Sequence, residues 1–183
     1  MANFSNSIFM TRIDTPIGEM LGGATENGIC LVEFKERKNL ESQLSGVSAY
    51  FKKELIKGNN QHLLKLQEQM NLYFLKKLKK FDLPLDLAGT AFQKSVWEAL
   101  LKIPYGSTVS YLELSKTMGN VKAIRAVANA NAANKIAIVI PCHRVISADG
   151  SLTGYAAGLW RKKRLLHLED LSGNKQLSLL DIL

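Results

Sequence analysis

The stretch NKIAIVIPCHRVI, residues 134–146, joins an apolar run to two chemically reactive side chains. Five consecutive apolar residues, Ile136 to Ile140, predict a buried strand that ends at Pro141. Cys142 and His143 follow at once, so one of the only two thiols in the chain lies beside an imidazole. Packing explains such a cysteine as readily as reactivity does, because free cysteine is among the most buried residue types. The flanking sequence must therefore decide whether Cys142 is a packed core residue or a nucleophile.

Length and composition are typical of a soluble protein. At 183 residues the chain is long enough for one medium domain or two small ones. Hydrophobic residues make up 46% of it, yet no apolar run approaches the roughly 20 residues that span a bilayer. The opening residues, MANFSNSIFMTRIDTPIG, lack the basic and apolar regions of a secretion signal. We therefore expect a cytoplasmic protein with no membrane association.

Charge and cysteine content narrow the chemistry. The net charge of +8 favours a polyanionic partner, nucleic acid first, although a solvated basic face gives the same value. Cys30 lies far from Cys142, and no spacing typical of a zinc site occurs, so we expect neither a disulfide framework nor a metal. We interpret Cys30, within ICLVEF, as a packed core thiol. Phosphate hydrolysis and dinucleotide redox chemistry lack their glycine-rich motifs.

The first half of the chain mixes strand and helix patterns. Residues 12–34 predict paired strands, because MLGGAT and ICLVEF flank a turn at Asn27-Gly28. A mixed helical pattern covers residues 39–57. The stretch QHLLKLQEQMNLYFLKKLKKF predicts an amphipathic helix. The lysines at its end are interpreted as a solvated helix end, with a nucleic-acid contact as the alternative. The apolar stripe is Leu63, Leu66, Met70, Tyr73, Phe74 and Leu78, and the lysines are Lys76, Lys77, Lys79 and Lys80.

Helix-start signals dominate after a linker at residues 82–89. Thr90 with Gln93, and Ser110 with Glu113, match the capping-box pattern and predict two helix starts. The second of these helices is short and is followed by another. A pair of short helices joined by a tight turn is typical of a helix-turn-helix, although such pairs also occur in proteins that never touch DNA.

The second helix of this pair, capped by Asn120, has an unusual composition. It carries Lys122 and Arg125, which suit a nucleic-acid contact. Much of it is alanine, including Ala126 and Ala128. A helix of small residues is either packed tightly in a core or able to approach a nucleic-acid backbone closely.

The thiol of Cys142 is a useful nucleophile only as a thiolate, so its neighbours must lower its pKa. Candidate neighbours are His143, Arg144 and the basic cluster at residues 161–164. In a Cys-His pair a third group orients the imidazole, and Glu169 is the distant candidate. One cysteine beside one histidine also arises by chance, so the pair alone leaves catalysis open.

Three stretches together resemble a known family: GTAFQKSVWEALLKIPYGSTVSYLEL, RAVANANAANKIAIVIPCHRVI and GSLTGYAAGLWRKKRLLHLE. In order and spacing they are similar to the O6-alkylguanine-DNA alkyltransferases, or methylated-DNA–protein-cysteine methyltransferases. The match is dense over residues 89–169, and the first part of the chain fits the family's variable N-terminal domain. The resemblance implies an α/β (α+β) fold with a small mixed domain at residues 1–85, a mostly helical domain at residues 86–170 and a tail at residues 171–183.

The resemblance also implies a reaction on double-stranded DNA. Cys142 takes the alkyl group from O6-alkylguanine by direct displacement, His143 deprotonates the thiol through a water, and Glu169 holds the histidine. Asn134 ties this network together, and Tyr111 rotates the target phosphate and helps to protonate the leaving guanine. The thioether product has no evident route back to the thiol. Each molecule should therefore act once, as a monomer and without a cofactor.

Base flipping accounts for the remaining residues that the resemblance implies, because a base inside a duplex cannot reach a buried thiol. Arg125 resembles the finger that fills the vacated space. Tyr155 and the backbone of Val145 and Cys142 fit the guanine pocket. The family inserts its helix-turn-helix into the minor groove, which is only about 6 Å wide, and small side chains permit that approach. The predicted DNA-binding set is completed by Ser110, Lys122, Ala126 and Ala128.

Two other functions fit parts of the sequence. A non-catalytic helix-turn-helix protein would recognise alkylated bases, but the presence of Cys142 counts against it. A Cys-His hydrolase or acyl transferase would turn over repeatedly on a small ester or amide and ignore DNA. Within the family, relatives often carry bulkier or hydroxylated residues at Ala156-Ala157-Gly158, so the preferred alkyl group stays open, as does repair of O4-alkylthymine.

The tail that follows the family match, DLSGNKQLSLLDIL, contains a separate motif. Residues Gln176-Leu177-Ser178-Leu179-Leu180 resemble a bacterial sliding-clamp-binding peptide and follow a short spacer. The alternative is an amphipathic terminal turn that packs on the domain. A sliding clamp bound through Gln176–Leu180 is therefore a hypothetical second partner.

Overall fold

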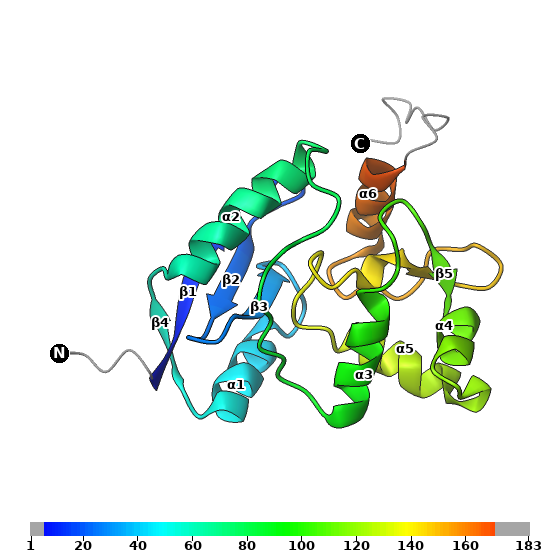
Figure 1. The fold of residues 1–183 in the computed structure, drawn as a ribbon, viewed down its shortest axis with the longest axis horizontal. Helices are drawn as coiled ribbons and strands as arrows, with labels where there is room; N and C mark the ends of the chain where they lie inside the picture. Colours follow the sequence, from blue (N-terminus) through cyan, green and yellow to red (C-terminus); the bar gives the residue numbers. More distant parts are fainter. Residues whose placement is uncertain (1–5, 171–183) are drawn as a thin grey trace.

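The computed structural model describes residues 6–170 and has a mixed α+β fold (Figure 1). A sheet with the helices α1 and α2 forms the N-terminal half, and a mostly helical C-terminal half lies beside it. The sheet has the strand order β3-β2-β1-β4, antiparallel except for the parallel pair β1 and β4. Its strands are β1 (Ser7–Ile13), β2 (Met20–Ala24), β3 (Ile29–Phe34) and β4 (Glu54–Lys57).

The predicted strand pair and its turn are present, and the turn is held from outside. Thr25 N donates to the carbonyl oxygen of Gly28 at 3.0 Å and closes the loop between β2 and β3. A Cβ at Gly28 would lie 2.4 Å from the carbonyl oxygen of Pro84, so only glycine fits there. Ile29 N donates to that same oxygen at 2.8 Å. The predicted linker is thus an extended segment bound to the edge of β3.

Helix α1 (Leu40–Phe51) packs on β3 and β4, and helix α2 (Gln61–Phe74) packs on β2 and β3. The apolar stripe of α2 is buried at Leu63, Leu66 and Met70 as its periodicity predicts. The helix ends at Phe74, earlier than expected, because Lys76 adopts a left-handed backbone with φ 58°. The four lysines therefore lie in the segment that follows the helix and not on the helix itself.

The two predicted capping boxes are both formed. Thr90 Oγ1 accepts from Gln93 N at 3.2 Å while Gln93 Oε1 accepts from Thr90 N at 2.9 Å. Ser110 and Glu113 make the same reciprocal pair at 3.1 and 2.6 Å. Because each cap satisfies two of the amides that a helix start leaves unpaired, both helices begin at the predicted residues. The elements here are α3 (Ala91–Leu100), β5 (Val109–Ser110), α4 (Tyr111–Thr117), η2 (Val121–Ala123), α5 (Ile124–Ala132), η3 (Cys142–Arg144), β6 (Val145–Ile146) and α6 (Leu159–Glu169).

The third predicted helix start is shifted. The side chain of Asn120 accepts from Lys122 N at 3.2 Å, but it caps the 3-10 turn η2, and α5 begins only at Ile124. The turn between α4 and α5 contains Gly119 at φ 76°, a conformation that favours glycine. Helices α4 and α5 pack against one another and form the predicted helix-turn-helix pair.

The predicted strand over residues 136–140 is wrong, although the segment is buried. It makes only single bridges, from Ile136 to Val32 of β3 and between Ala137 and Ile140, and Ile138 has a positive φ of 72°. Asn134 takes the place of a ladder partner, since its Oδ1 accepts from Ile136 N at 2.9 Å and its Nδ2 donates to the carbonyl oxygen of Ile140 at 3.0 Å. An apolar run reports burial, and here a side-chain amide satisfies the backbone in place of a sheet.

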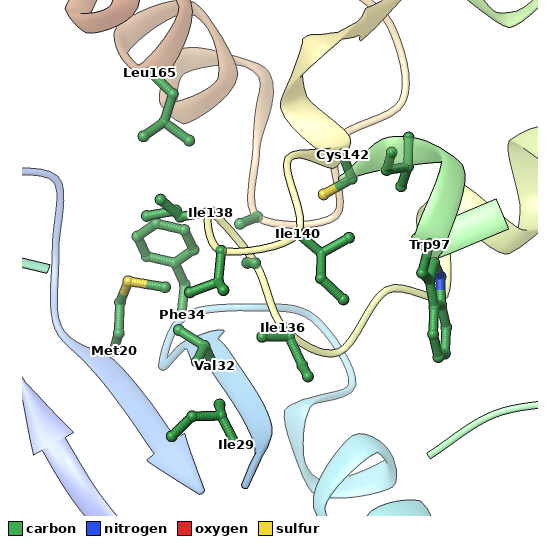
Figure 2. Packing of buried hydrophobic residues seen from close by; sticks show 14 of the residues in the cluster. Met20, Ile29, Val32, Phe34, Trp97, Ile136, Ile138, Ile140, Cys142 and Leu165 are labelled. Carbon is green, nitrogen blue, oxygen red and sulfur yellow. The ribbon is translucent and has the colours of Figure 1, made fainter. Parts of the chain in front are cut away.

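One apolar core runs through both halves of the molecule (Figure 2). Val32 and Phe34 from β3 meet Ile138 of the buried loop and Leu165 of α6 in the same cluster. Trp97 of α3 is buried in it as well. The division at residue 85 stays a prediction. Within residues 6–170, no helix has the length and apolar character that crossing a membrane requires.

Candidate active site

Cys142 lies at the first position of η3, where the buried loop turns after Pro141 (Figure 2). Its amide donates to the carbonyl oxygen of Ile140 at 2.8 Å, and the residue is 7% exposed. Burial raises the pKa of the thiol to about 11, against a hydrogen bond with Asn134 and the charge of Lys162. The group is therefore a thiol at neutral pH, and it needs a base before it can attack.

His143 follows Cys142 and bonds Glu169. Its Nε2 lies 2.8 Å from Glu169 Oε1, and both side chains are at most 1% exposed. Burial lowers the pKa of His143, despite the hydrogen bond and charge of Glu169, so the ring is neutral at pH 7. An ionised carboxylate only accepts, so the ring proton is assigned to Nε2 and Nδ1 keeps its lone pair. Nδ1 is buried and has no hydrogen-bond partner within residues 6–170, which suits a base.

Glu169 is held by several donors besides His143. Arg144 binds both carboxylate oxygens, with Nε at 2.8 Å from Oε2 and Nη2 at 2.9 Å from Oε1. The hydroxyl of Tyr73 donates to Oε1 at 2.6 Å, and the amide of Gly106 reaches Oε2 at 3.4 Å. Although burial alone would raise it, the pKa of Glu169 is held far below its usual range by the hydrogen bonds from His143 and Arg144. The carboxylate stays ionised and fixed in direction.

Sequence reasoning misses the roles of two of these residues. It places Arg144 as a cation beside Cys142, but Arg144 binds Glu169 and, through Nη1, the carbonyl oxygen of Ile103 at 2.6 Å. It assigns Tyr73 only to the apolar stripe of α2. The contact of Tyr73 with Glu169 joins residues 96 positions apart, and no local pattern in the sequence signals it.

The predicted residues Asn134 and Tyr111 both lie near the thiol. Asn134 braces the loop that carries Cys142, through the hydrogen bonds described above. The pKa of Tyr111 is raised by burial and by the neighbouring Cys142, against a hydrogen bond with Asn131. A Cβ added at Gly154 would lie 3.1 Å from the Tyr111 hydroxyl. Tyr111, the first residue of α4, therefore reaches from the helix-turn-helix to the loop that precedes α6.

A narrow cleft leads to Cys142. Tyr155, Ala156 and Ala157 form one wall of it, and Glu33 and Arg37 of the N-terminal half line the cleft as well. Its volume is about 10 Å³, room for roughly one water molecule and far less than a purine. The Tyr155 hydroxyl is buried here and has no hydrogen-bond partner within the described part of the chain. A group much larger than a water molecule reaches the thiol only if this wall moves.

The contribution of β3 and the turn after it to the cleft is not predicted by the sequence. Arg37 forms a buried ion pair with Glu33 and donates to the carbonyl oxygens of Asn134 at 3.2 Å and of Ala132 at 3.1 Å. The N-terminal half thus fixes both the end of α5 and the loop that carries the thiol. A wider cavity of about 810 Å³ lies on the other side of Arg144, but neither Cys142 nor His143 lines it.

The backbone of Val145, expected in the guanine pocket, already makes hydrogen bonds within the protein. Its amide donates to the carbonyl oxygen of Cys142, and its own carbonyl oxygen accepts from Lys162 Nζ at 2.6 Å and keeps a second lone pair for another donor. Lys162 also donates to the carbonyl oxygen of Thr153 at 2.6 Å, and burial lowers its pKa to about 8. Of the predicted basic cluster, Arg161 and Lys162 point inward and Lys163 is exposed.

The helix-turn-helix presents the remaining predicted residues. Lys122, Arg125 and Ala126 are exposed, and Ala128 is half-buried. Ser110 caps α4 through its hydroxyl. Small side chains beside two exposed cations leave the backbone of α5 open to a close approach.

The geometry contains two functional arrangements. A buried thiol next to a neutral, oriented imidazole is the arrangement of a nucleophile with its base. An exposed helix-turn-helix with basic residues is the arrangement of a nucleic-acid-binding module. The fold and the site together define a class of proteins that combine a buried cysteine–histidine pair with a helix-turn-helix.

Comparison with known proteins identifies the family. Residues 8–87 match the ribonuclease-like domain of 6-O-methylguanine DNA methyltransferase, and residues 91–171 match the DNA-binding domain of the same family. The chain belongs to the 6-O-methylguanine DNA methyltransferase family.

Individual relatives agree over nearly the whole chain. The methylated-DNA–protein-cysteine methyltransferase of Methanosarcina acetivorans is 46% identical over 88% of this chain and 98% of its own length. The Mycobacterium tuberculosis O6-methylguanine methyltransferase structure is 39% identical, with a TM-score of 0.77 over 94% of this chain and 99% of that chain. The structure of Mycobacterium tuberculosis OGT in complex with DNA is also 39% identical, with a TM-score of 0.76 over 88% of this chain and 92% of that chain.

Proposed function

We propose that this protein repairs alkylated DNA by transferring the alkyl group of O6-alkylguanine irreversibly to the sulfur of Cys142. The observation that carries the proposal is the arrangement of Cys142 and His143, whose Nδ1 is buried without a partner among residues 6–170 while Nε2 is held by Glu169. The relatives named as methylated-DNA–protein-cysteine methyltransferases support the same chemistry. DNA is the expected partner because Lys122 of η2 and Arg125 of α5 are exposed beside the small side chain of Ala126.

The reaction begins with delivery of the base. The target nucleotide is flipped out of the duplex, because the thiol lies inside the protein. Arg125, exposed on α5, fills the vacated space, and Lys122 contacts phosphate. The base enters by displacing the wall that carries Tyr155. That wall lies between Gly154 at φ 59° and Gly158 at φ 100°, so glycines flank the segment that moves.

The chemical step is a displacement at the alkyl carbon. His143 Nδ1 takes the thiol proton through a water, and the thiolate sulfur forms a bond to the alkyl carbon. The bond between that carbon and guanine O6 breaks, its electron pair stays on the guanine, and Tyr111 assists in protonating the leaving base. Glu169 stabilises the imidazolium that forms. The product is a thioether with no evident route back to the free thiol, so each protein molecule performs one transfer.

Stoichiometry tests the proposal. The protein is incubated with a duplex that contains labelled O6-methylguanine, and label on protein is measured against protein supplied. We expect a plateau near one methyl group per molecule, loss of transfer in Cys142→Ala, and full transfer in Cys30→Ala. Cys30 is the matched control because burial raises its pKa to about 12 and it lies in a separate small cluster of the core.

The two alternative functions give different outcomes. Repeated turnover on a small ester, with no dependence on DNA, would identify a Cys-His hydrolase. Tight binding of the alkylated duplex with no label on the protein would identify a non-catalytic reader of alkylated bases. Repair of O4-alkylthymine is tested in parallel by placing that base in the same duplex.

The proposal includes action as a monomer in the cytoplasm. It also includes a bacterial sliding clamp as a second partner. Gln176–Leu180, the suggested sliding-clamp peptide, lies outside the described residues. Deleting residues 176–183 should abolish binding to a bacterial sliding clamp and leave alkyl transfer intact. Failure of the full-length protein to bind the clamp would remove this partner.

A further inference from the structure

We infer that Tyr73, on helix α2 of the N-terminal half, is a positioning residue for alkyl transfer that fixes Glu169 and tunes the basicity of His143. The inference rests on the proposed function. It assigns the N-terminal half an indirect part in the reaction, through one hydroxyl group that binds the carboxylate of Glu169 behind the histidine.

The contacts converge on a single oxygen. Glu169 Oε1 accepts from the Tyr73 hydroxyl at 2.6 Å, from His143 Nε2 at 2.8 Å and from Arg144 Nη2 at 2.9 Å. Tyr73 and His143 are fully buried, and Glu169 is 1% exposed. The phenol and the imidazole therefore share one acceptor atom away from water, where each hydrogen bond counts more than it would at the surface.

The ring of Tyr73 is locked in place, so its hydroxyl cannot turn elsewhere. Phe74 and Phe81 hold it with ring centroids at 5.3 and 5.4 Å, and Tyr105 packs edge-on at 6.1 Å. Tyr105 has a hydroxyl too, but it donates to the carbonyl oxygen of Leu168 at 3.2 Å and not to the carboxylate. Two neighbouring buried or half-buried tyrosines thus have separable roles.

The physical consequence follows from how donors share the charge of a carboxylate. Each hydrogen-bond donor to Oε1 stabilises part of its negative charge. The hydrogen bonds that the same oxygen accepts from the other donors become weaker. When the Tyr73 hydroxyl is removed, more of the negative charge on Glu169 Oε1 acts on His143. That charge stabilises the imidazolium, so the pKa of His143 rises. The same removal takes away one of the contacts that fix the direction of Glu169.

The other charged and titratable groups near this pair stay in place when Tyr73 changes. Arg144 faces Glu169 from η3, and Tyr105 faces it from the loop before β5. Lys162 of α6 acts on His143 from a separate element. Burial and Glu169 raise the pKa of Tyr73 well above its usual range, so its hydroxyl remains a donor at every pH of the test.

The experiment compares Tyr73→Phe with Tyr105→Phe in the full-length protein. Single-turnover transfer from a saturating O6-methylguanine duplex is measured between pH 5.5 and 9. For Tyr73→Phe we expect the acid limb of the rate profile to move up by about half a pH unit. We also expect the limiting rate to fall several-fold with unchanged half-saturation by DNA. Tyr105→Phe should keep the wild-type profile.

A merely structural tyrosine would lower the unfolding midpoint and leave the pH profile in place, and that result overturns the inference. If Tyr73→Phe does not fold, site-specific 3-fluorotyrosine at position 73 replaces it. The fluorine makes the phenol a stronger donor, so the acid limb should then move down, and an unmoved limb again overturns the inference. Absence of any transfer by the wild-type protein refutes the proposed function itself, which keeps the two failures distinct.

Discussion

Arg161, in the first turn of α6, donates through Nε to the carbonyl oxygen of Ile17 at 2.8 Å, across 144 positions of the chain. Its guanidinium lies 4.6 Å from the ring centroid of Phe34 and 4.4 Å from that of Trp160. Nη1 donates to the carbonyl oxygen of Ala157 at 2.9 Å, in the wall of the cleft beside Cys142. One buried cation therefore connects the N-terminal half to the wall of the cleft beside Cys142.

Arg161→Gln should destabilise the protein by about 3 kcal/mol, because two buried carbonyl oxygens lose their donor and the stacked guanidinium is removed. Glu36 pairs with the same side chain at 2.5 Å but is 72% exposed, so Glu36→Gln should cost less than about 1 kcal/mol. Urea unfolding at pH 7 measures both. Equal losses in the two variants would show that the surface ion pair is the dominant contact.

The free energy of unfolding should fall as the pH drops from about 6.5 to 5.5. Burial lowers the pKa of His143 in the folded state from its ordinary 6.5, so the unfolded chain takes up a proton there before the folded protein does. The stabilisation is complete above about pH 6.5 and is lost as the pH falls, with a slope of at most about 1.4 kcal/mol per pH unit. Urea midpoints across this range measure the slope. His143→Gln should flatten it, and an unchanged slope in that variant would assign the dependence to other groups.

Two glycines should respond to alanine in opposite directions. Gly46 is exposed within α1, and a Cβ added there would meet no atom within 4 Å, so Gly46→Ala should stabilise the helix by about 0.5–1 kcal/mol. A Cβ at Gly89 would lie 2.6 Å from the buried ring of Trp97, so Gly89→Ala should destabilise by about 1–3 kcal/mol. Thermal and urea unfolding give both values. Destabilisation by Gly46→Ala would mean that α1 is not helical at that position.

Lys122, an exposed cation of the helix-turn-helix, should contribute to the salt dependence of DNA binding. Lys122→Ala should weaken duplex binding regardless of sequence and reduce the slope of log affinity against log salt by about 0.9, the value for one phosphate contact. Lys57→Ala, an exposed lysine on β4, is the control and should leave that slope unchanged.

Arg125→Ala should slow alkyl transfer from duplex DNA at least tenfold and leave transfer from the free O6-methylguanine nucleoside unchanged, because only the duplex has a vacated space to fill. Single-turnover rates on the two substrates measure the ratio. An equal loss on both substrates would place Arg125 in the chemical step or in folding, and no loss on either would remove the finger.

Local signals were reliable wherever a few neighbouring residues settle the outcome. Thr90 with Gln93 set a helix start because both partners of each hydrogen bond lie within one turn. The buried stripe of α2 follows from the helical period alone. The strand prediction for residues 136–140 was wrong because contacts from outside the run, and not its apolar pattern, set the backbone there. Its apolar run shows that it is buried, while the amide of Asn134 and a bridge to Val32 determine its backbone path.

By itself the sequence determined the family, the mixed α+β class and the helix starts at Ala91 and Tyr111, and it predicted the thiol with its histidine. These depend on residues close together or on a long ordered match. Only the tertiary structure decided that Tyr73, Arg144 and His143 meet on one carboxylate, that Arg37 supports the thiol loop, and that the cleft is too narrow for a base at rest. Such contacts depend on how separate helices and loops pack against one another, and periodicity carries information over only a few residues.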